Sequence, residues 1–129
     1  MLSLYSGMSR AGPKRRVLFV EDEVSLRRSY QRYFGERYDV VVAADGAEAL
    51  RLAGERVPDV AVLDLRLPDT DGIALLRRLR ALAPALPVVI TSAYLSLEPQ
   101  FSVLDLPHHG YLVKPFDLAE LGSRIDAAG

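Results

Sequence analysis

Residues 17–23 read Val-Leu-Phe-Val-Glu-Asp-Glu, so four apolar residues lead directly into three acidic ones. Four more short apolar runs follow along the chain. All five runs are rich in β-branched residues and are continuous rather than alternating, which is typical of strands buried on both faces of a parallel sheet. The later runs are Val40–Ala43, Val60–Leu63, Val88–Ile90 and Tyr111–Val113.

Amphipathic segments with apolar residues at helical spacing alternate with these runs and predict helices. The weakest is Leu97–Leu106, where Pro99 leaves room for only a short helix. Strand and helix alternate five times, which implies right-handed crossovers and a three-layer α/β domain. The apolar positions of the other four segments span Leu26–Phe34, Ala47–Ala53, Ile73–Leu79 and Leu118–Ile125.

Two of the predicted helices carry a capping signal. Asp45 precedes one helix and is followed three residues later by Glu48, and Asp117 and Glu120 repeat the pattern before the last helix. In a capping box, the two side chains satisfy free N–H groups at the helix start. We therefore expect helix starts at these two positions.

The composition of the 129-residue chain limits its class. The chain has no Cys, which rules out disulfides, thiolate metal sites and a cysteine nucleophile. Sixteen basic and seventeen acidic residues give a net charge of −1, which argues against binding nucleic acid or a membrane surface through bulk charge. No apolar run approaches the roughly 18 residues that span a bilayer. We expect residues 1–15 to be a flexible lead-in and residues 16–127 to form one domain.

Chemically active side chains follow four of the apolar runs. Glu21 and Asp22 follow the first run, Asp64 the third, Ser92 the fourth and Lys114 the fifth. Ligands of open parallel sheets bind beyond the carboxyl ends of the strands. Carboxylates held about 5 Å apart repel by roughly 3 kcal/mol per pair at an effective dielectric of about 20. The cluster therefore needs counter-charge from Lys114 and a divalent cation, and Mg²⁺ suits such oxygen ligands.

These motifs together resemble the receiver domain of bacterial two-component response regulators. They stand in the family's order and at family-like spacing over residues 16–127. The resemblance implies a flavodoxin-like, doubly wound fold with five parallel strands in the order 2-1-3-4-5 and five helices. The motifs are Glu21-Asp22-Glu23, Val-Leu-Asp64-Leu-Arg-Leu-Pro68-Asp-Thr-Asp71-Gly72, Ile-Thr-Ser92-Ala93 and Tyr111-Leu-Val-Lys114-Pro115-Phe116.

The resemblance also implies a phosphorylation site with a bound Mg²⁺ ion. Asp64 corresponds to the phosphoacceptor and Asp22 to a direct metal ligand. Glu21 stands where most family members have Asp, at a position that usually binds the metal through water. The backbone carbonyl of Arg66 would complete the protein ligands of Mg²⁺.

Three further positions match groups that respond to the phosphoryl group. Lys114 would neutralise one phosphoryl oxygen and Ser92 would donate to another. Tyr111 stands at the aromatic switch position, and it would swing inward when Ser92 moves. The resemblance further implies a cis Lys114–Pro115 peptide bond.

The implied function is a signalling switch rather than a turnover enzyme. A sensor histidine kinase or a phosphotransfer protein would supply the phosphoryl group, in a Mg²⁺-dependent step that the domain catalyses itself, with autodephosphorylation as the only other reaction. The target would be a downstream protein or an output domain, such as a transcriptional one, that the chain lacks, because the chain ends after its last predicted helix. We expect a cytoplasmic location, a possible dimer, and no direct contact with nucleic acid or membrane.

Simpler interpretations exist for single residues. The acidic run at 21–23 is also typical of the first turn of a helix. Thr91 offers a hydroxyl beside Ser92, although side-chain alternation favours Ser92. Tyr111 is also compatible with ordinary packing in a strand. The pair His108 and His109 fits an exposed turn better than a metal site. The cluster of Arg77, Arg78 and Arg80 fits a solvated helix face better than a binding patch.

Three rival classes fit the motifs less well. A haloacid-dehalogenase-like phosphatase needs a second Asp two residues after its nucleophile, where this chain has Arg66. A flavodoxin-like FMN protein needs a phosphate-binding loop where residues 21–23 would repel a phosphate. A degenerate receiver would lack part of the acidic set, Ser92 or Lys114.

We also expect the bulky Arg66 and Tyr94 to slow hydrolysis of the phosphorylated Asp64.

Overall fold

The computed structural model describes residues 13–93 and 108–129. Most of the expected lead-in lies outside the described residues, as do the expected helix within 97–106 and Tyr94. The elements are β1 (Arg16–Val20), α2 (Val24–Phe34), β2 (Asp39–Ala43), α3 (Gly46–Glu55), β3 (Val60–Asp64), α4 (Gly72–Leu82), β4 (Val88–Ser92), β5 (Gly110–Val113) and α6 (Leu118–Ala127).

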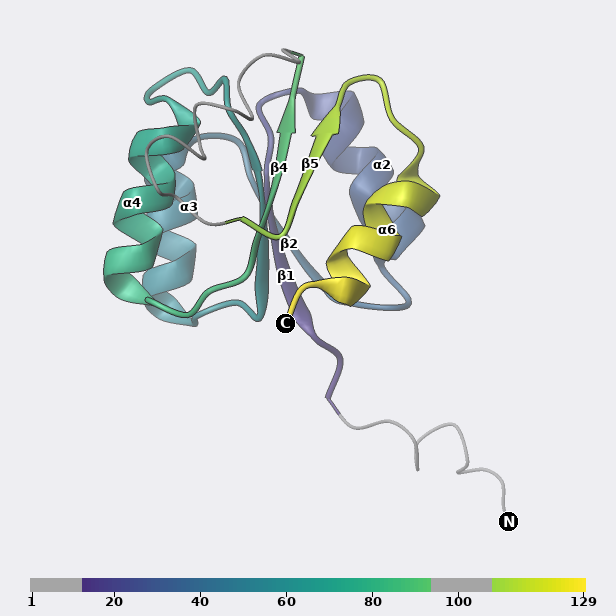
Figure 1. The fold of residues 1–129 in the computed structure, drawn as a ribbon, viewed down its shortest axis with the longest axis horizontal. Coiled ribbons are helices and arrows are strands. Elements are labelled where there is room, and N and C mark those ends of the chain that lie inside the picture. Colours follow the sequence, from purple (N-terminus) through teal and green to yellow (C-terminus); the bar gives the residue numbers. More distant parts are fainter. Residues whose placement is uncertain (1–12, 94–107) are drawn as a thin grey trace.

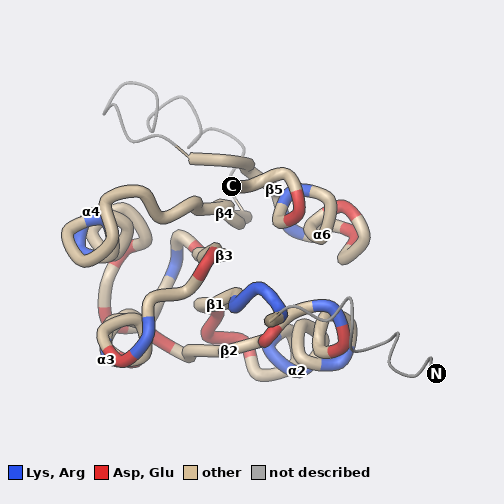
Figure 2. The backbone as a smooth tube through the Cα atoms, turned by 90° about the horizontal axis from the view of Figure 1, so that it is seen from below, with Lys and Arg blue, Asp and Glu red and all other residues tan. Residues whose placement is uncertain are grey.

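The five strands form one parallel sheet in the order β2-β1-β3-β4-β5, as predicted. Helices α3 and α4 cover one face of the sheet, and α2 and α6 cover the other (Figure 1). Figure 2 shows the same three layers from below, with charged residues on α2, α3, α4 and α6 and in the connecting loops. The described part of the chain holds four of the five predicted helices, and none of these is long and apolar enough to cross a membrane.

The core lies on both faces of the sheet and centres on β1 and β3. Residues 17–20 and 60–63 are each at most 1% exposed. Neighbouring residues of β1 pack on opposite faces: Leu18 joins the core under α3 and α4, while Phe19 stacks on Tyr30 of α2 with ring centroids 4.5 Å apart. Burial on both faces explains the continuous apolar runs. It also makes the carboxyl ends of these strands a firm base for polar groups.

Of the two predicted capping boxes, the structure forms the one at the start of α3. The Asp45 carboxylate accepts from the Glu48 N–H at 2.8 Å, as predicted. The Glu48 carboxylate accepts from the N–H of Ala44, one residue before the cap. The capping box expected at Asp117 is wrong, because this side chain makes no capping hydrogen bond at the start of α6. Asp117 is exposed, so water can reach the free N–H groups there.

Candidate functional site

Three predicted site residues lie at the edge of the sheet where the strands end. Glu21 follows β1 and donates its N–H to the Ala43 carbonyl at 2.9 Å. Asp64 is the last residue of β3. Lys114 follows β5 and donates its N–H to the Ser92 carbonyl at 2.8 Å. Backbone hydrogen bonds that continue the sheet thus hold all three residues at one edge.

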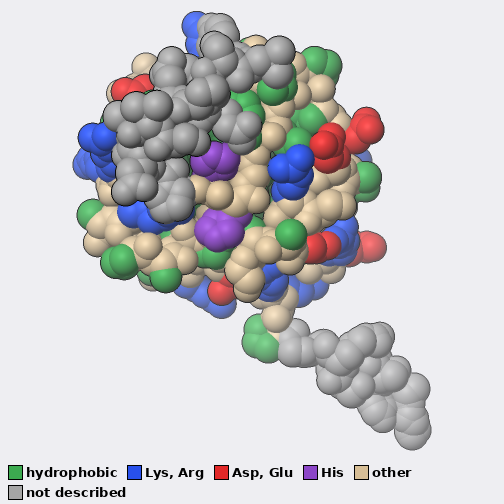
Figure 3. Space-filling view, in the orientation of Figure 1, with side chains coloured by type: hydrophobic (Ala, Val, Ile, Leu, Met, Phe, Trp, Pro, Cys, Tyr) green, Lys and Arg blue, Asp and Glu red, His purple; other side chains and the backbone are tan. Residues whose placement is uncertain are grey.

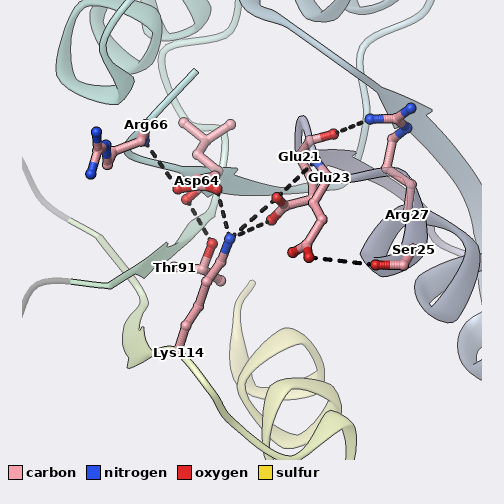
Figure 4. A network of polar contacts seen from close by, with 9 residues as sticks. Glu21, Glu23, Ser25, Arg27, Asp64, Arg66, Thr91 and Lys114 are labelled. Atoms are coloured by element: carbon pink, nitrogen blue, oxygen red, sulfur yellow. Dashed lines mark hydrogen bonds and ion pairs between the residues drawn. The ribbon is translucent and has the colours of Figure 1, made fainter. Parts of the chain in front are cut away.

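The Lys114 ammonium joins two buried carboxylates (Figure 4). Its Nζ lies 2.8 Å from Oδ2 of Asp64 and 2.9 Å from Oε1 of Glu21. Glu21 is 1% exposed and Asp64 4% exposed, so water does little to screen their mutual repulsion. The Lys114–Pro115 peptide bond is cis, as the resemblance implied. One positive charge therefore serves two carboxylates.

Asp22 extends this pair into a cluster of three carboxylates. One oxygen from each of Glu21, Asp22 and Asp64 lies within 4.8 Å of the other two. Asp22 is exposed, so the cluster is open to solvent on one side. Carboxylate oxygens gathered at an open edge suit Mg²⁺, which keeps several waters.

The shared ammonium leaves one carboxylate short of counter-charge. Burial raises the pKa of Glu21 to about 7, against the opposing effect of its hydrogen bond from Lys114. Burial alone would lower the pKa of Lys114, but its hydrogen bonds to Asp64 and Glu21 outweigh this effect and raise it. Lys114 thus stays charged, whereas Glu21 is costly to ionise until a further cation is present.

The loop after Asp64 folds back onto the strand that it leaves. The Arg66 N–H donates to Oδ1 of Asp64 at 3.0 Å, and Arg66 forms a bridge with Asp71. Gly72 opens α4 so close to β3 that a Cβ there would lie 2.7 Å from Cα of Leu65. The loop therefore holds the backbone of Arg66 beside Asp64.

The two neighbouring hydroxyls at the end of β4 are both buried. Thr91 pairs with Asp64 in the sheet register, and its Oγ1 contacts the Leu63 carbonyl at 3.5 Å. Ser92 pairs with Val113 of β5. The hydroxyl of Thr91 is thus engaged with the neighbouring strand, while Ser92 is the last residue of β4 at the edge that carries Asp64.

Tyr111 and the two histidines lie on the β5 side of the sheet. The Tyr111 side chain is 9% exposed and belongs to the core on the α3 and α4 face, with its ring 6.3 Å from that of His108. Both histidines reach the surface (Figure 3). Nδ1 of His109 accepts from the Val88 N–H at 3.3 Å. Among residues 13–93 and 108–129, neither histidine joins a group of three possible metal ligands.

The sequence analysis gave no functional role to Arg27 or Tyr30, which lie near Glu21. Arg27 of α2 donates to the Glu21 backbone carbonyl at 2.7 Å, and the Glu23 N–H donates to Glu21 Oε2 at 3.2 Å. Burial, with the charges of Glu21 and Asp64, raises the pKa of Tyr30, whose buried hydroxyl has no hydrogen-bond partner in the described structure. No motif or spacing marks these positions, because the contacts depend on where α2 packs.

Comparison with known families supports one assignment. The model of the response regulator receiver domain family matches residues 17–126. Among solved structures, a CheY-like receiver domain protein of Methanospirillum hungatei superposes with a TM-score of 0.81 at 28% identity, covering 88% of this chain and 92% of that one. The receiver domain of the Francisella response regulator 1452 gives a TM-score of 0.78 at 37% identity, covering 88% and 94%.

Curated relatives are longer than this chain. The transcriptional regulatory protein PrrA of Mycobacterium tuberculosis is 43% identical over 115 residues, which are 87% of this chain and 48% of that protein. The transcriptional activator protein PfeR of Pseudomonas aeruginosa is 40% identical over 116 residues, which are 89% of this chain and 38% of that protein. The chain therefore spans about half or less of these relatives.

Proposed function

The chain belongs to the response regulator receiver domain family, and from this premise we propose that Asp64 accepts a phosphoryl group that switches the domain. Receiver domains are signalling modules rather than a class of turnover enzymes. The observation that carries the proposal is the pairing of Lys114 Nζ with Asp64 and Glu21, at 2.8 and 2.9 Å, beside the solvent-open Asp22. This arrangement joins a nucleophilic carboxylate, a fixed cation and oxygen ligands for a metal.

The proposed reaction forms an acyl phosphate on Asp64. A carboxylate oxygen attacks phosphorus, the bond from phosphorus to the histidine nitrogen of the partner breaks, and the imidazole keeps the electron pair and takes up a proton. The Lys114 ammonium is already within hydrogen-bonding distance of Asp64. It can therefore shift from the carboxylate to a phosphoryl oxygen as the negative charge moves there. The Arg66 N–H holds the other carboxylate oxygen at 3.0 Å and orients the nucleophile.

Mg²⁺ fits the acidic cluster and would neutralise equatorial phosphoryl oxygens in the transition state. Asp22 and Asp64 would bind it directly, Glu21 through water, and the backbone carbonyl of Arg66 would complete the protein ligands. The burial that makes an ionised Glu21 costly without a second cation supports this set.

The switch would run through Ser92 to Tyr111. Ser92 ends β4, and its carbonyl accepts from the N–H of Lys114, which follows β5. Movement of Ser92 toward a phosphoryl group would therefore also shift the end of β5. Tyr111 lies one strand away with its ring buried in the core. Two positions of these side chains would give the face around β5 and α6 two shapes, and the phosphoryl group would favour one.

The phosphoryl donor would be a sensor histidine kinase or a phosphotransfer protein. A hollow of about 210 Å³ opens beside the site, and Glu23, Leu26, Lys114, Pro115 and Phe116 line it. Its apolar lining next to Lys114 suits a helix of a partner that delivers a phosphohistidine. The names of PrrA and PfeR support an output in transcription, through a linked output domain or a separate target. The proposal includes a cytoplasmic location and a dimer.

Phosphorylation by a small acyl phosphate tests the proposal. With Mg²⁺, the intact mass of the wild-type chain should rise by one phosphoryl group, and Asp64→Asn or excess EDTA should prevent this. Asp59→Asn is the matched control, because Asp59 precedes β3 at the opposite end of the strand and accepts from the Arg16 N–H. Phosphate on the Asp64→Asn protein, or none on the wild type, would reject Asp64 as the acceptor.

The lifetime of the phosphoryl group tests the effects expected of Arg66 and Tyr94. Arg66 is exposed two residues after Asp64, and attacking water must approach phosphorus in line. We expect Arg66→Asn and Tyr94→Ala each to shorten the lifetime several-fold in a dephosphorylation time course. Unchanged rates in both variants would show that neither side chain restricts water.

A further inference from the structure

The loop between β3 and α4 is tied down at both of its ends. Near Asp64, the Arg66 N–H donates to the carboxylate and Arg66 bridges to Asp71. At the far end, Asp71 caps α4 by accepting from the Ala74 N–H at 2.7 Å. These contacts lie within the loop and its own flanking elements, and in the middle of the loop Leu67 packs against the core under α3 and α4.

Asp69 links the middle of the loop to a different helix. One oxygen of its carboxylate accepts from the Gly46 N–H at 2.8 Å, and the other accepts from the Ala47 N–H at 2.9 Å. Both donors belong to the first turn of α3, where N–H groups lack partners inside the helix. The two hydrogen bonds hold the pKa of Asp69 below its usual range. A charged carboxylate is favoured at this end of the helix dipole.

The contact depends on the absence of a side chain at Gly46. A Cβ built there would lie 2.5 Å from Cγ2 of Thr70 and 3.3 Å from Oδ1 of Asp69. The loop and the helix are therefore packed as closely as a glycine allows. Asp45 separately caps α3 through the Glu48 N–H, so Asp69, unlike Asp45, joins this helix to another segment.

We propose that Asp69 is a positioning residue, which holds the backbone carbonyl of Arg66 at the metal site by fastening the loop to the start of α3. The role rests on the proposed function, because it is exerted on a ligand of the proposed Mg²⁺ site. In this role, the start of α3 supports the metal site through Asp69, although α3 contributes no side chain to the acidic cluster.

Variants at the two sides of the contact test the proposal. Asp69→Ala removes both acceptors, and Asp69→Asn keeps one. Gly46→Ala adds a Cβ on α3 that pushes the loop away from the helix. The double variant Gly46→Ala, Thr70→Ser removes the Thr70 methyl group that the new Cβ meets. Asp45→Ala is the matched control, because it also removes a carboxylate from the start of α3 but leaves the loop attached.

Three measurements separate positioning from general destabilisation. Calorimetric titration with Mg²⁺ gives the affinity for the metal. Amide hydrogen exchange at Arg66 in EDTA shows how firmly the loop is held when no metal is bound. Phosphorylation rates at limiting and saturating Mg²⁺ show whether the defect lies in binding. Loss of a group that hydrogen-bonds a metal ligand directly weakens metal binding by about 10–100-fold. Asp69 acts on Arg66 through the loop, so we take the lower end of this range, about tenfold. We expect about that loss and faster Arg66 exchange for Asp69→Ala and Gly46→Ala, partial recovery for Asp69→Asn and the double variant, and near-normal phosphorylation at saturating Mg²⁺.

Two outcomes would overturn the role of Asp69. One is unchanged Mg²⁺ affinity and Arg66 exchange in Asp69→Ala, and the other is an equal loss in Asp45→Ala. Failure of the proposed function is separate, because the wild-type chain would then take no phosphate, while Mg²⁺ affinity and amide exchange would still report on Asp69.

Discussion

Replacing Glu21 with Gln should stabilise the metal-free domain at neutral pH. Glu21 is 1% exposed and shares the single charge of Lys114 with Asp64. Gln keeps the shape of the side chain and removes its charge. The variant therefore isolates the free-energy cost of an ionised carboxylate in this pocket.

The size of the effect follows from the pKa. Burial raises the pKa of Glu21 from 4.5 to about 7. Because the folded-state pKa lies above the unfolded one, the unfolded chain loses this proton first as the pH rises, and folding stability falls between pH 4.5 and about 7. A shift of this size corresponds to about 3 kcal/mol at full ionisation. That is a large part of the roughly 5–15 kcal/mol by which a domain is stable.

Urea unfolding in EDTA, followed by circular dichroism at several pH values, measures this difference. The free energy of unfolding of Glu21→Gln should match that of the wild type near pH 4.5 and exceed it by about 3 kcal/mol at about pH 8. Glu36→Gln, at an exposed position after α2, should show no such pH-dependent gain. Added Mg²⁺ should shrink the gap, because it supplies the missing positive charge to the wild type. A gap that is constant with pH, or a wild type that is the more stable at about pH 8 in EDTA, would refute the reasoning.

Three further substitutions test the packing around the site. Lys114→Ala should abolish phosphorylation and lower the free energy of unfolding by about 3 kcal/mol at neutral pH in EDTA, because two buried carboxylates lose their counter-charge. Gly72→Ala should destabilise by about 2 kcal/mol in urea unfolding, because its Cβ would meet Cα of Leu65 at 2.7 Å. The control Gly54→Ala, with nothing within 4 Å of its Cβ in α3, should stabilise by about 0.5–1 kcal/mol. Tyr30→Phe should raise the thermal midpoint in calorimetry, because it removes a buried hydroxyl without a partner at a gain of about 1 kcal/mol.

The sheet could be predicted from sequence because burial on both faces leaves a strong mark. Residues 17–20 and 60–63 read as unbroken apolar runs, and the structure buries each of them almost completely. Helix ends were less predictable, since Asp45 caps its helix and Asp117 does not. A capping residue type gives the opportunity for a hydrogen bond, while the local backbone and solvent exposure decide whether it forms.

The meeting of Glu21, Asp64 and Lys114 could also be predicted, because parallel strands bring their carboxyl ends to one edge. Contacts from helices and loops could not. Arg27 reaches the Glu21 carbonyl only because α2 packs at a particular rotation, and Asp69 reaches α3 across 22 to 23 positions of sequence. Strand register fixes the contacts among the strand-end residues. The contacts from helices and loops depend on how far a side chain reaches between elements that are placed separately.

The difference between these two kinds of contact bears on how the site would be tuned. The acidic cluster stands on the most buried strands, so its spacing is set by the core and changes little without unfolding. The outer contacts from α2 and α3 are partly buried or exposed and can change at smaller cost. A substitution or a partner that shifts the start of α3 would therefore alter metal affinity through Asp69 and leave the nucleophile in place. On this argument, Mg²⁺ affinity should vary among surface variants of α3 more than the rate of phosphorylation at saturating Mg²⁺ does.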